Sequence, residues 1–227
     1  DAATGALAVP SAFNANPYLA DDTFLLSSVT LRHAPGLLLR EGAPLARLTA
    51  SAAAGANVQH RDAGTSLYAF LASLLEVPLA PSLRSPSGRL LQHMPEAAPL
   101  VVGALAPVGE ALLRQLLAGV AGAVPEYRVA EITDVLAALS TLCHEHICGW
   151  AQAVIARTPD AVAQAKDKEA LFAAFKVCAD AALFIRRSCR TVGRACGTRH
   201  GRGSGRRCSP RRSSSSPGAS ARRHCSS

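Results

Sequence analysis

Metal-binding residue types gather in one hexapeptide, Cys143–Cys148, which reads CHEHIC. Cysteine and histidine are the usual protein ligands of zinc. A zinc site needs its ligands to converge, but on a helix Cys143 and His144 point about 100° apart. Residues 1–187 offer no second cluster of such ligands. We therefore interpret the hexapeptide as a corner between two helices with two surface histidines, and predict no metal site.

A second motif, His60-Arg61-Asp62, matches the catalytic triplet of protein kinases. The glycine-rich loop, the lysine strand and the DFG triplet that complete a kinase site are absent from the sequence. We predict instead that Asp62 caps a helix. The sequence also lacks a phosphate-binding P-loop, a GxSxG elbow and the Rossmann glycine set. These absences favour a protein that is not an enzyme and takes no cofactor.

The elements around these motifs repeat. Helical segments are predicted to begin near Pro44, Pro86 and Tyr127, at steps of 42 and 41 residues. A two-helix unit of about 40–47 residues is typical of HEAT repeats. Hydrophobic residues make up 49% of the chain, aromatic residues only 4%, and alternating strand patterns are scarce. We predict an all-α fold, an α-solenoid of HEAT-like antiparallel helix pairs that holds a partner along its surface.

Individual helices follow from apolar spacing and turn residues. A helix is expected from about Asp21, with Asp21 or Asp22 as its cap, to His33, and another from Pro44 to Ala54. Four apolar stripes should face the core. They are Leu67, Phe70, Leu71, Leu74 and Leu75; Val108, Leu112, Leu116, Leu117 and Val120; Val129, Ile132, Val135, Leu136, Leu139 and Leu142; and Ile147, Trp150, Ala151, Val154 and Ile155. A last helix, Lys166 to Arg187, should bury Leu171, Phe175, Cys178, Ala182 and Ile185.

Charge divides the chain into two parts. The net charge is +8, yet residues 186–227 hold twelve arginines and no acid, which leaves 12 basic and 16 acidic residues before them. We predict a frayed segment at 1–16, a HEAT-repeat array at 17–187 and a disordered Arg/Ser-rich tail at 188–227. Arg206, Arg207, Arg211 and Arg212 are candidates to contact phosphate groups or an acidic surface. An alternative is that the tail has no function.

Cysteine usage and hydropathy suggest where such a chain works. The seven cysteines form no CxxC pair and are expected to be reduced thiols of an intracellular protein. No apolar run reaches about 18 residues, so no membrane span or membrane partner is predicted. The chain begins at Asp1 without a charged-then-apolar leader, which we interpret as a fragment or a processed piece.

Several stretches of the sequence, in order and at consistent spacing, resemble the C-terminal part of nuclear transport receptors of the importin-β superfamily, in the transportin-SR and importin-thirteen branch. The similar segments are Ala20–Phe24 (ADDTF), Gln59–Ala63 (QHRDA) with Ser66, Phe70, Leu71 and Leu74 after it, Val124–Leu136 (VPEYRVAEITDVL), Cys148–Trp150 (CGW) with 151–159, and 171–187. They span roughly residues 17–187. The chain departs from the family in its alanine content, its few aromatic residues and its Arg/Ser tail.

The resemblance implies a function and partners. It implies nuclear import of protein cargo, including Arg/Ser-rich splicing factors, under the control of Ran-GTP, by a receptor that shuttles between cytoplasm and nucleus. Glu131 and Asp134 are candidate cargo-facing acids, which the basic tail could also occupy as a mimic of cargo. Two alternatives stay open: a helical scaffold or adaptor without a Ran link, and an RNA-binding protein that acts through its tail.

Overall fold

A computed structural model describes residues 7, 10–40, 42–79, 93–159 and 166–177. Contacts divide the chain into two units, Asp1–Ser188 and Cys189–Ser227, and every described residue lies in the first. The described residues contain helices and no strand, which confirms the predicted all-α class. The predicted helix start at Pro86 and the predicted tail lie outside the described residues.

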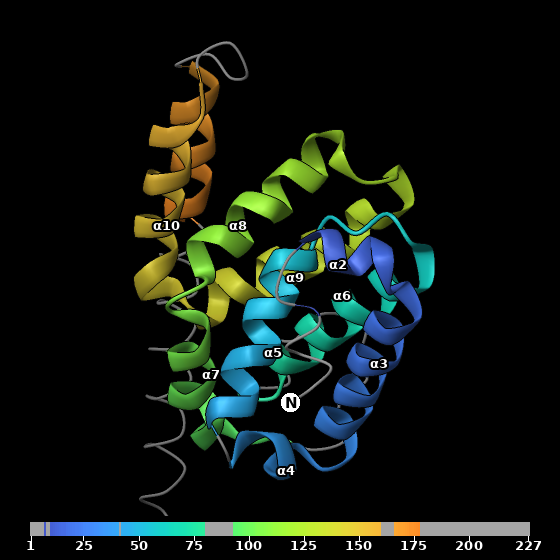
Figure 1. The fold of residues 1–227 in the computed structure, drawn as a ribbon. Helices are drawn as coiled ribbons and strands as arrows, with labels where there is room; N and C mark the ends of the chain where they lie inside the picture. Colours follow the sequence, from blue (N-terminus) through green and yellow to red (C-terminus); the bar gives the residue numbers. More distant parts are fainter. Residues whose placement is uncertain (1–6, 8–9, 41, 80–92, 160–165, 178–227) are drawn as a thin grey trace, which may run out of the picture. The chain divides into compact units, whose positions relative to one another are not determined.

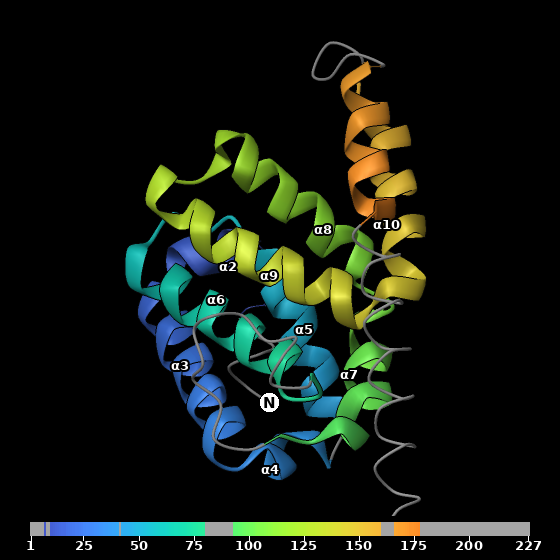
Figure 2. The same ribbon diagram turned by 180° about the vertical axis from the view of Figure 1, so that it is seen from behind.

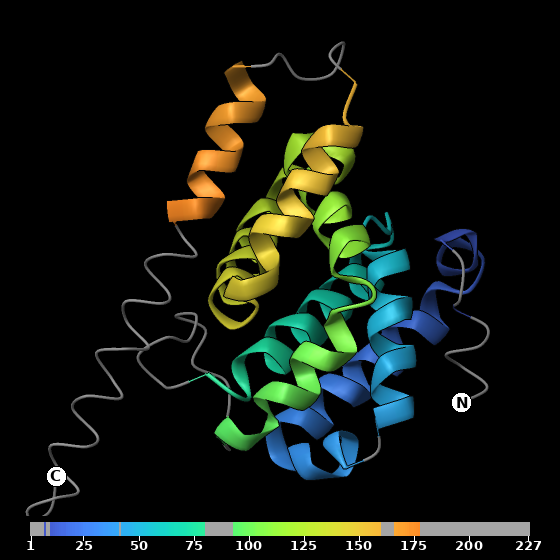
Figure 3. The same ribbon diagram turned by 90° about the vertical axis from the view of Figure 1, so that its left-hand side faces the viewer.

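The helices follow one another with short connections. In chain order they are α2 (Pro10–Ala15), α3 (Pro17–His33), α4 (Pro35–Leu39), α5 (Gly42–Gly55), α6 (Arg61–Glu76), η2 (Pro95–Ala97), α7 (Ala98–Leu105), α8 (Gly109–Ala118), η3 (Gly119–Ala123), η4 (Glu126–Arg128), α9 (Val129–Leu142) and α10 (His144–Arg157). Residues 166–177 form a further helix, drawn in orange beside α10 in Figure 3.

The longer helices pack as two layers. Helix α6 contacts α3 and α9, and the three lie side by side in Figure 2. Helix α8 contacts α5 and α10 in the second layer (Figure 1). The chain passes between the layers from α5 to α6, and again from α8 to α9 and on to α10, while α7 packs on α5. Each helix thus packs on its neighbours in the stack, as in a HEAT-like array.

The core lies between these layers and is aliphatic, with a small aromatic cluster at the α3 end. Phe24 of α3 lies 5.4 Å from Phe70 of α6 and 6.0 Å from Phe13 of α2, measured between ring centroids. The predicted stripe of α6, Leu67 to Leu75, is completely buried. Residues 10–15, which we expected to be frayed, instead form α2 and bury Phe13.

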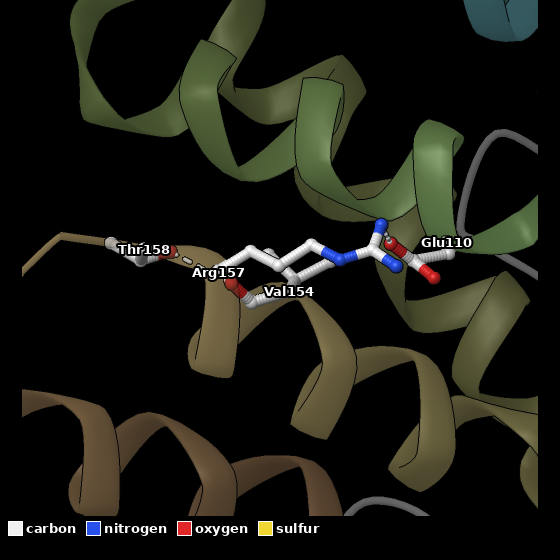
Figure 4. Close-up of polar contacts among 4 residues, drawn as sticks. All are labelled: Glu110, Val154, Arg157 and Thr158. Atoms are coloured by element: carbon white, nitrogen blue, oxygen red, sulfur yellow. Dashed lines mark hydrogen bonds and ion pairs between the residues drawn. The ribbon is translucent and has the colours of Figure 1, made fainter.

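Polar side chains support the helices in two ways. Within α3, the hydroxyls of Thr23, Ser27, Ser28 and Thr30 each donate to a carbonyl three or four residues earlier in the same helix, at 2.7–2.9 Å. Between helices, the exposed guanidinium of Arg157 on α10 pairs with Glu110 on α8 (Figure 4). Such an exposed ion pair contributes only about 0–1 kcal/mol, so packing rather than charge holds α8 to α10.

Two helix starts differ from the prediction. Helix α3 begins at Pro17, four residues before Asp21, because proline is well suited to the first helical turn. Asp21 instead accepts a hydrogen bond from the Ser66 hydroxyl at 2.5 Å. Helix α6 is capped by His60, whose Nδ1 accepts from the Ala63 N–H at 3.4 Å, and Asp62 lies in the first turn. The predicted caps at Asp21 or Asp22 and at Asp62 are therefore wrong.

Several predicted core positions are also wrong. Leu136 is only half-buried, while Leu139 and Ala138 of the same helix are buried. Val120 is 46% exposed because α8 ends at Ala118 and the chain changes course at Gly122, whose φ is +105°. Leu171 is exposed, and Phe175 is buried in its place at that end. Cys178, Ala182 and Ile185 lie outside the described residues.

Candidate partner-binding surface on helices α3, α6 and α9

The two predicted cargo-facing acids, Glu131 and Asp134, line one pocket. They project from α9, where a spacing of three residues places side chains on the same face. Asp134 is exposed and Glu131 is half-buried. The pocket lies where α3, α6 and α9 meet, and its other lining residues are Arg32, Thr65, Tyr68, Ala69, Ala72, Ser73 and Glu76.

Acidic residues predominate among the ionisable side chains that line this pocket. Glu76, Glu131 and Asp134 contribute three carboxyl groups, against the single guanidinium of Arg32. Arg32 is held within its own helix, because its Nε donates to the Ser28 carbonyl at 3.2 Å and its Nη2 to the Ser28 hydroxyl at 2.9 Å. A pocket lined mainly by acidic side chains attracts cationic groups.

Tyr68 lines the pocket and is almost completely buried. Its hydroxyl donates to the Ala56 carbonyl at 2.6 Å. Burial raises the pKa of Tyr68 to about 12, Arg128 opposes this rise, and Glu131 adds to it. The phenol therefore stays neutral and serves to join α6 to the end of α5 rather than to transfer protons.

Arg128, directly before α9, is the largest fully buried side chain in the described part of the chain. Its Nη1 donates to the Val58 carbonyl at 2.6 Å, and its Nη2 to the carbonyls of His60 and Arg61 at 2.7 and 2.9 Å. The guanidinium lies over the ring of Tyr127, 5.7 Å from its centroid, and packs against Gly64. Arg128 thus fixes the start of α9 to the α5–α6 connection and sets where Glu131 and Asp134 project.

The apolar pattern of the sequence did not identify Arg128 as a core residue, although the spacing of that pattern reaches it. The buried residues of α9 follow the series Ile132, Val135, Leu139 and Leu142, and one turn before Ile132 lies residue 128, not 129. We assigned the stripe to Val129, which is half-buried, because an arginine is not expected on an apolar face. Arg32, Tyr68 and Glu76 come from other helices, so only the fold brings them to the acids.

The hexapeptide Cys143–Cys148 does form the predicted corner, since α9 ends at Leu142 and α10 begins at His144. His146 is exposed, but His144 is 8% exposed and buried, so the prediction of two surface histidines is wrong for His144. Over the described ranges, no three Cys, His, Asp or Glu side chains gather as a metal site would require.

Arg206, Arg207, Arg211 and Arg212 lie outside the described residues. Where the structure is described, no single helix has the length and hydropathy to cross a membrane, although the pair Pro95–Leu105 and Gly109–Ala123, bent by 82°, meets those criteria jointly.

The fold places the chain in the class of proteins built from stacked helix pairs. Here acidic residues line a pocket between neighbouring helices. No protein-family model matches the chain. The chain is 30% identical over 146 residues to Transportin MOS14 of Arabidopsis thaliana, which covers 64% of this chain and 14% of that protein. This distant similarity confirms the resemblance to the transportin-SR branch of the importin-β family. The aligned region is a small part of the relative's length.

Proposed function

We propose that this chain is part of a nuclear transport receptor and holds protein cargo along its helices. The similarity to a transportin is the observation that carries the proposal, and the HEAT-like packing of α3 to α10 supports it. Such a receptor binds and releases its cargo without chemical change, so its activity is not enzymatic. It would move between cytoplasm and nucleus under the control of Ran-GTP.

The acidic pocket is the proposed place where basic cargo contacts this chain. Glu131 and Asp134 both line the pocket, and the exposed carboxylate of Asp134 is open to an arginine side chain of an extended Arg/Ser-rich peptide. Arginine pairs well with carboxylates because its planar guanidinium can donate two parallel hydrogen bonds. Binding should weaken as salt rises, since exposed charges are screened over about 8 Å at physiological ionic strength.

Fluorescence anisotropy with a labelled Arg/Ser peptide tests the cargo surface. The double variant Glu131→Gln with Asp134→Asn should weaken binding about tenfold or more. The control pair Asp62→Asn with Glu96→Gln removes the same charge from exposed positions outside the pocket and should leave binding unchanged. An equal loss in both double variants would contradict a specific site.

A second measurement separates the receptor from the alternatives. Capture on immobilised Ran-GTP, compared with Ran-GDP, distinguishes a transport receptor from a scaffold or adaptor without a Ran link. RNA binding by the whole chain, compared with a chain shortened by residues 188–227, tests the tail-based alternative. If the chain binds the peptide but is not captured on Ran-GTP, the cargo surface is supported and the control by Ran-GTP is contradicted.

A further inference from the structure

Arg32 lies among the acids of the pocket without pairing with them. Of the described residues that line the pocket, Arg32 alone is basic. Its side chain is half-buried, and over the described ranges it forms no ion pair with Glu76, Glu131 or Asp134. A guanidinium beside carboxylates ordinarily turns towards them, because the two groups can form parallel hydrogen bonds. A different contact therefore holds this guanidinium.

That contact is with Ser28, which lies four residues earlier on α3 and therefore on the same face of the helix. The Nε of Arg32 donates to the Ser28 carbonyl at 3.2 Å, and its Nη2 donates to the Ser28 hydroxyl at 2.9 Å. The hydroxyl itself donates to the Leu25 carbonyl at 2.9 Å. A serine hydroxyl has one proton to donate and two lone pairs, so the bond to Leu25 leaves a lone pair for Arg32. Because Ser28 is completely buried, this arrangement is protected from water.

An Arg32 side chain released from Ser28 would compete with an arginine of a bound peptide. It belongs to the chain that carries the acids, and a tethered group has a high effective concentration at a site within its reach. Asp134 is the exposed acid that lines the same pocket. If Arg32 paired with Asp134, its positive charge would also repel a second guanidinium. Holding Arg32 on α3 therefore favours binding of an external cation.

We propose that Ser28 is a positioning residue of the cargo surface, which holds Arg32 on α3 and so keeps the carboxylate of Asp134 open to an arginine of the peptide. The inference rests on the proposed function, because it concerns the same pocket. It adds a residue that does not line the pocket and acts only through Arg32. Ser28 therefore matters for binding only while an arginine occupies position 32.

Anisotropy of a labelled Arg/Ser peptide tests this dependence in the full chain. Ser28→Ala should weaken binding at least threefold, whereas Arg32→Met should bind as tightly as the wild type or more tightly, and adding Ser28→Ala to Arg32→Met should change nothing. Ser27→Ala is the matched control, because Ser27 is also buried and its hydroxyl donates to the Thr23 carbonyl, not to Arg32. No effect of Ser28→Ala, an equal effect of Ser27→Ala, or a loss that persists with Arg32→Met would overturn the proposal.

A double-mutant cycle in urea tests the role of Ser28 without any peptide. Asp134→Asn should lower the unfolding midpoint more in the Ser28→Ala background than in the wild type, because only the released Arg32 pairs with Asp134. Equal shifts in the two backgrounds would overturn the proposal even if the peptide binds. A chain that binds no peptide yet shows this coupling would contradict the proposed function and support the role of Ser28 in holding Arg32.

Discussion

At the scale of single residues, Arg128 has the clearest energetic role. Replacing Arg128 by Met would leave the buried carbonyl of Val58 without this donor and would remove the guanidinium bonds to the carbonyls of His60 and Arg61, although the His60 carbonyl still accepts from the Gly64 N–H. An unsatisfied buried polar group costs about 1–3 kcal/mol, so we expect a loss of about 1–3 kcal/mol in the free energy of unfolding by urea. Arg157→Met is the control, because it removes only an exposed ion pair and should cost less than about 1 kcal/mol.

Tyr68 predicts a dependence of stability on alkaline pH. Its pKa is about 12 in the folded chain, against about 10 for an exposed tyrosine, so folding favours the neutral phenol. Because the pKa is higher in the folded chain than in the unfolded one, this contribution to stability is fully present below pH 10 and is lost as the pH rises from 10 to 12.

Urea unfolding at pH 9, 10 and 11 should therefore show a steeper fall for the wild type than for Tyr68→Phe. The phenylalanine variant is less stable at pH 9, because it lacks the hydrogen bond to the Ala56 carbonyl. Parallel pH curves for the two proteins would show that the phenol does not titrate differently on folding.

At the scale of helices, a glycine fixes how closely α8 approaches α10. A methyl group on Gly109 would overlap the indole of Trp150, whereas a methyl group on Gly103 of α7 meets nothing within 4 Å. Alanine normally stabilises a helix by about 0.5–1 kcal/mol relative to glycine. We expect that gain for Gly103→Ala and a loss of about 1–3 kcal/mol for Gly109→Ala, measured by chemical unfolding. A gain in both would show that Trp150 moves aside easily.

The different burial of Leu136 and Leu139 on α9 gives a second test, of which face of this helix packs in the core. Leu139 is completely buried and Leu136 is half-buried, on the same helix. Leu139→Ala should cost about 2–5 kcal/mol, and Leu136→Ala clearly less, because fewer neighbours surround the atoms removed. Equal losses in thermal melts would place both side chains in the core.

Most of the helices and their buried faces could be predicted from the sequence. Helix type and order follow from apolar spacing, and the buried stripe of Leu67 to Leu75 is confirmed because every member lies on one face of a single helix. The caps and the pocket could not be predicted so well. His60 caps α6 in place of Asp62 because its ring nitrogen accepts from the Ala63 N–H, which residue type alone does not predict. Arg32, Tyr68 and Glu131 line one pocket only because α3, α6 and α9 pack together.

At the scale of the whole molecule, the contacts between neighbouring helices predict that backbone amides are protected from hydrogen exchange to different degrees in different helices. Helix α6 packs between α3 and α9, and α8 packs between α5 and α10. In stacked arrays stability is roughly a sum over units and their interfaces, so elements flanked on both sides open least. Hydrogen exchange should be slowest in α6 and α8 and faster in α3 and α10. Uniform rates throughout would indicate a single cooperative unit.

The hydroxyl groups of α3 carry an evolutionary consequence. Ser27 and Ser28 are buried, yet their hydrogen-bond acceptors belong to the same helix. A neighbouring helix therefore does not have to co-evolve a matching polar partner, and each surface can drift separately as long as its volume and apolar character persist. Stacks of this kind can lose most of their ancestral residues while the arrangement of their helices is inherited.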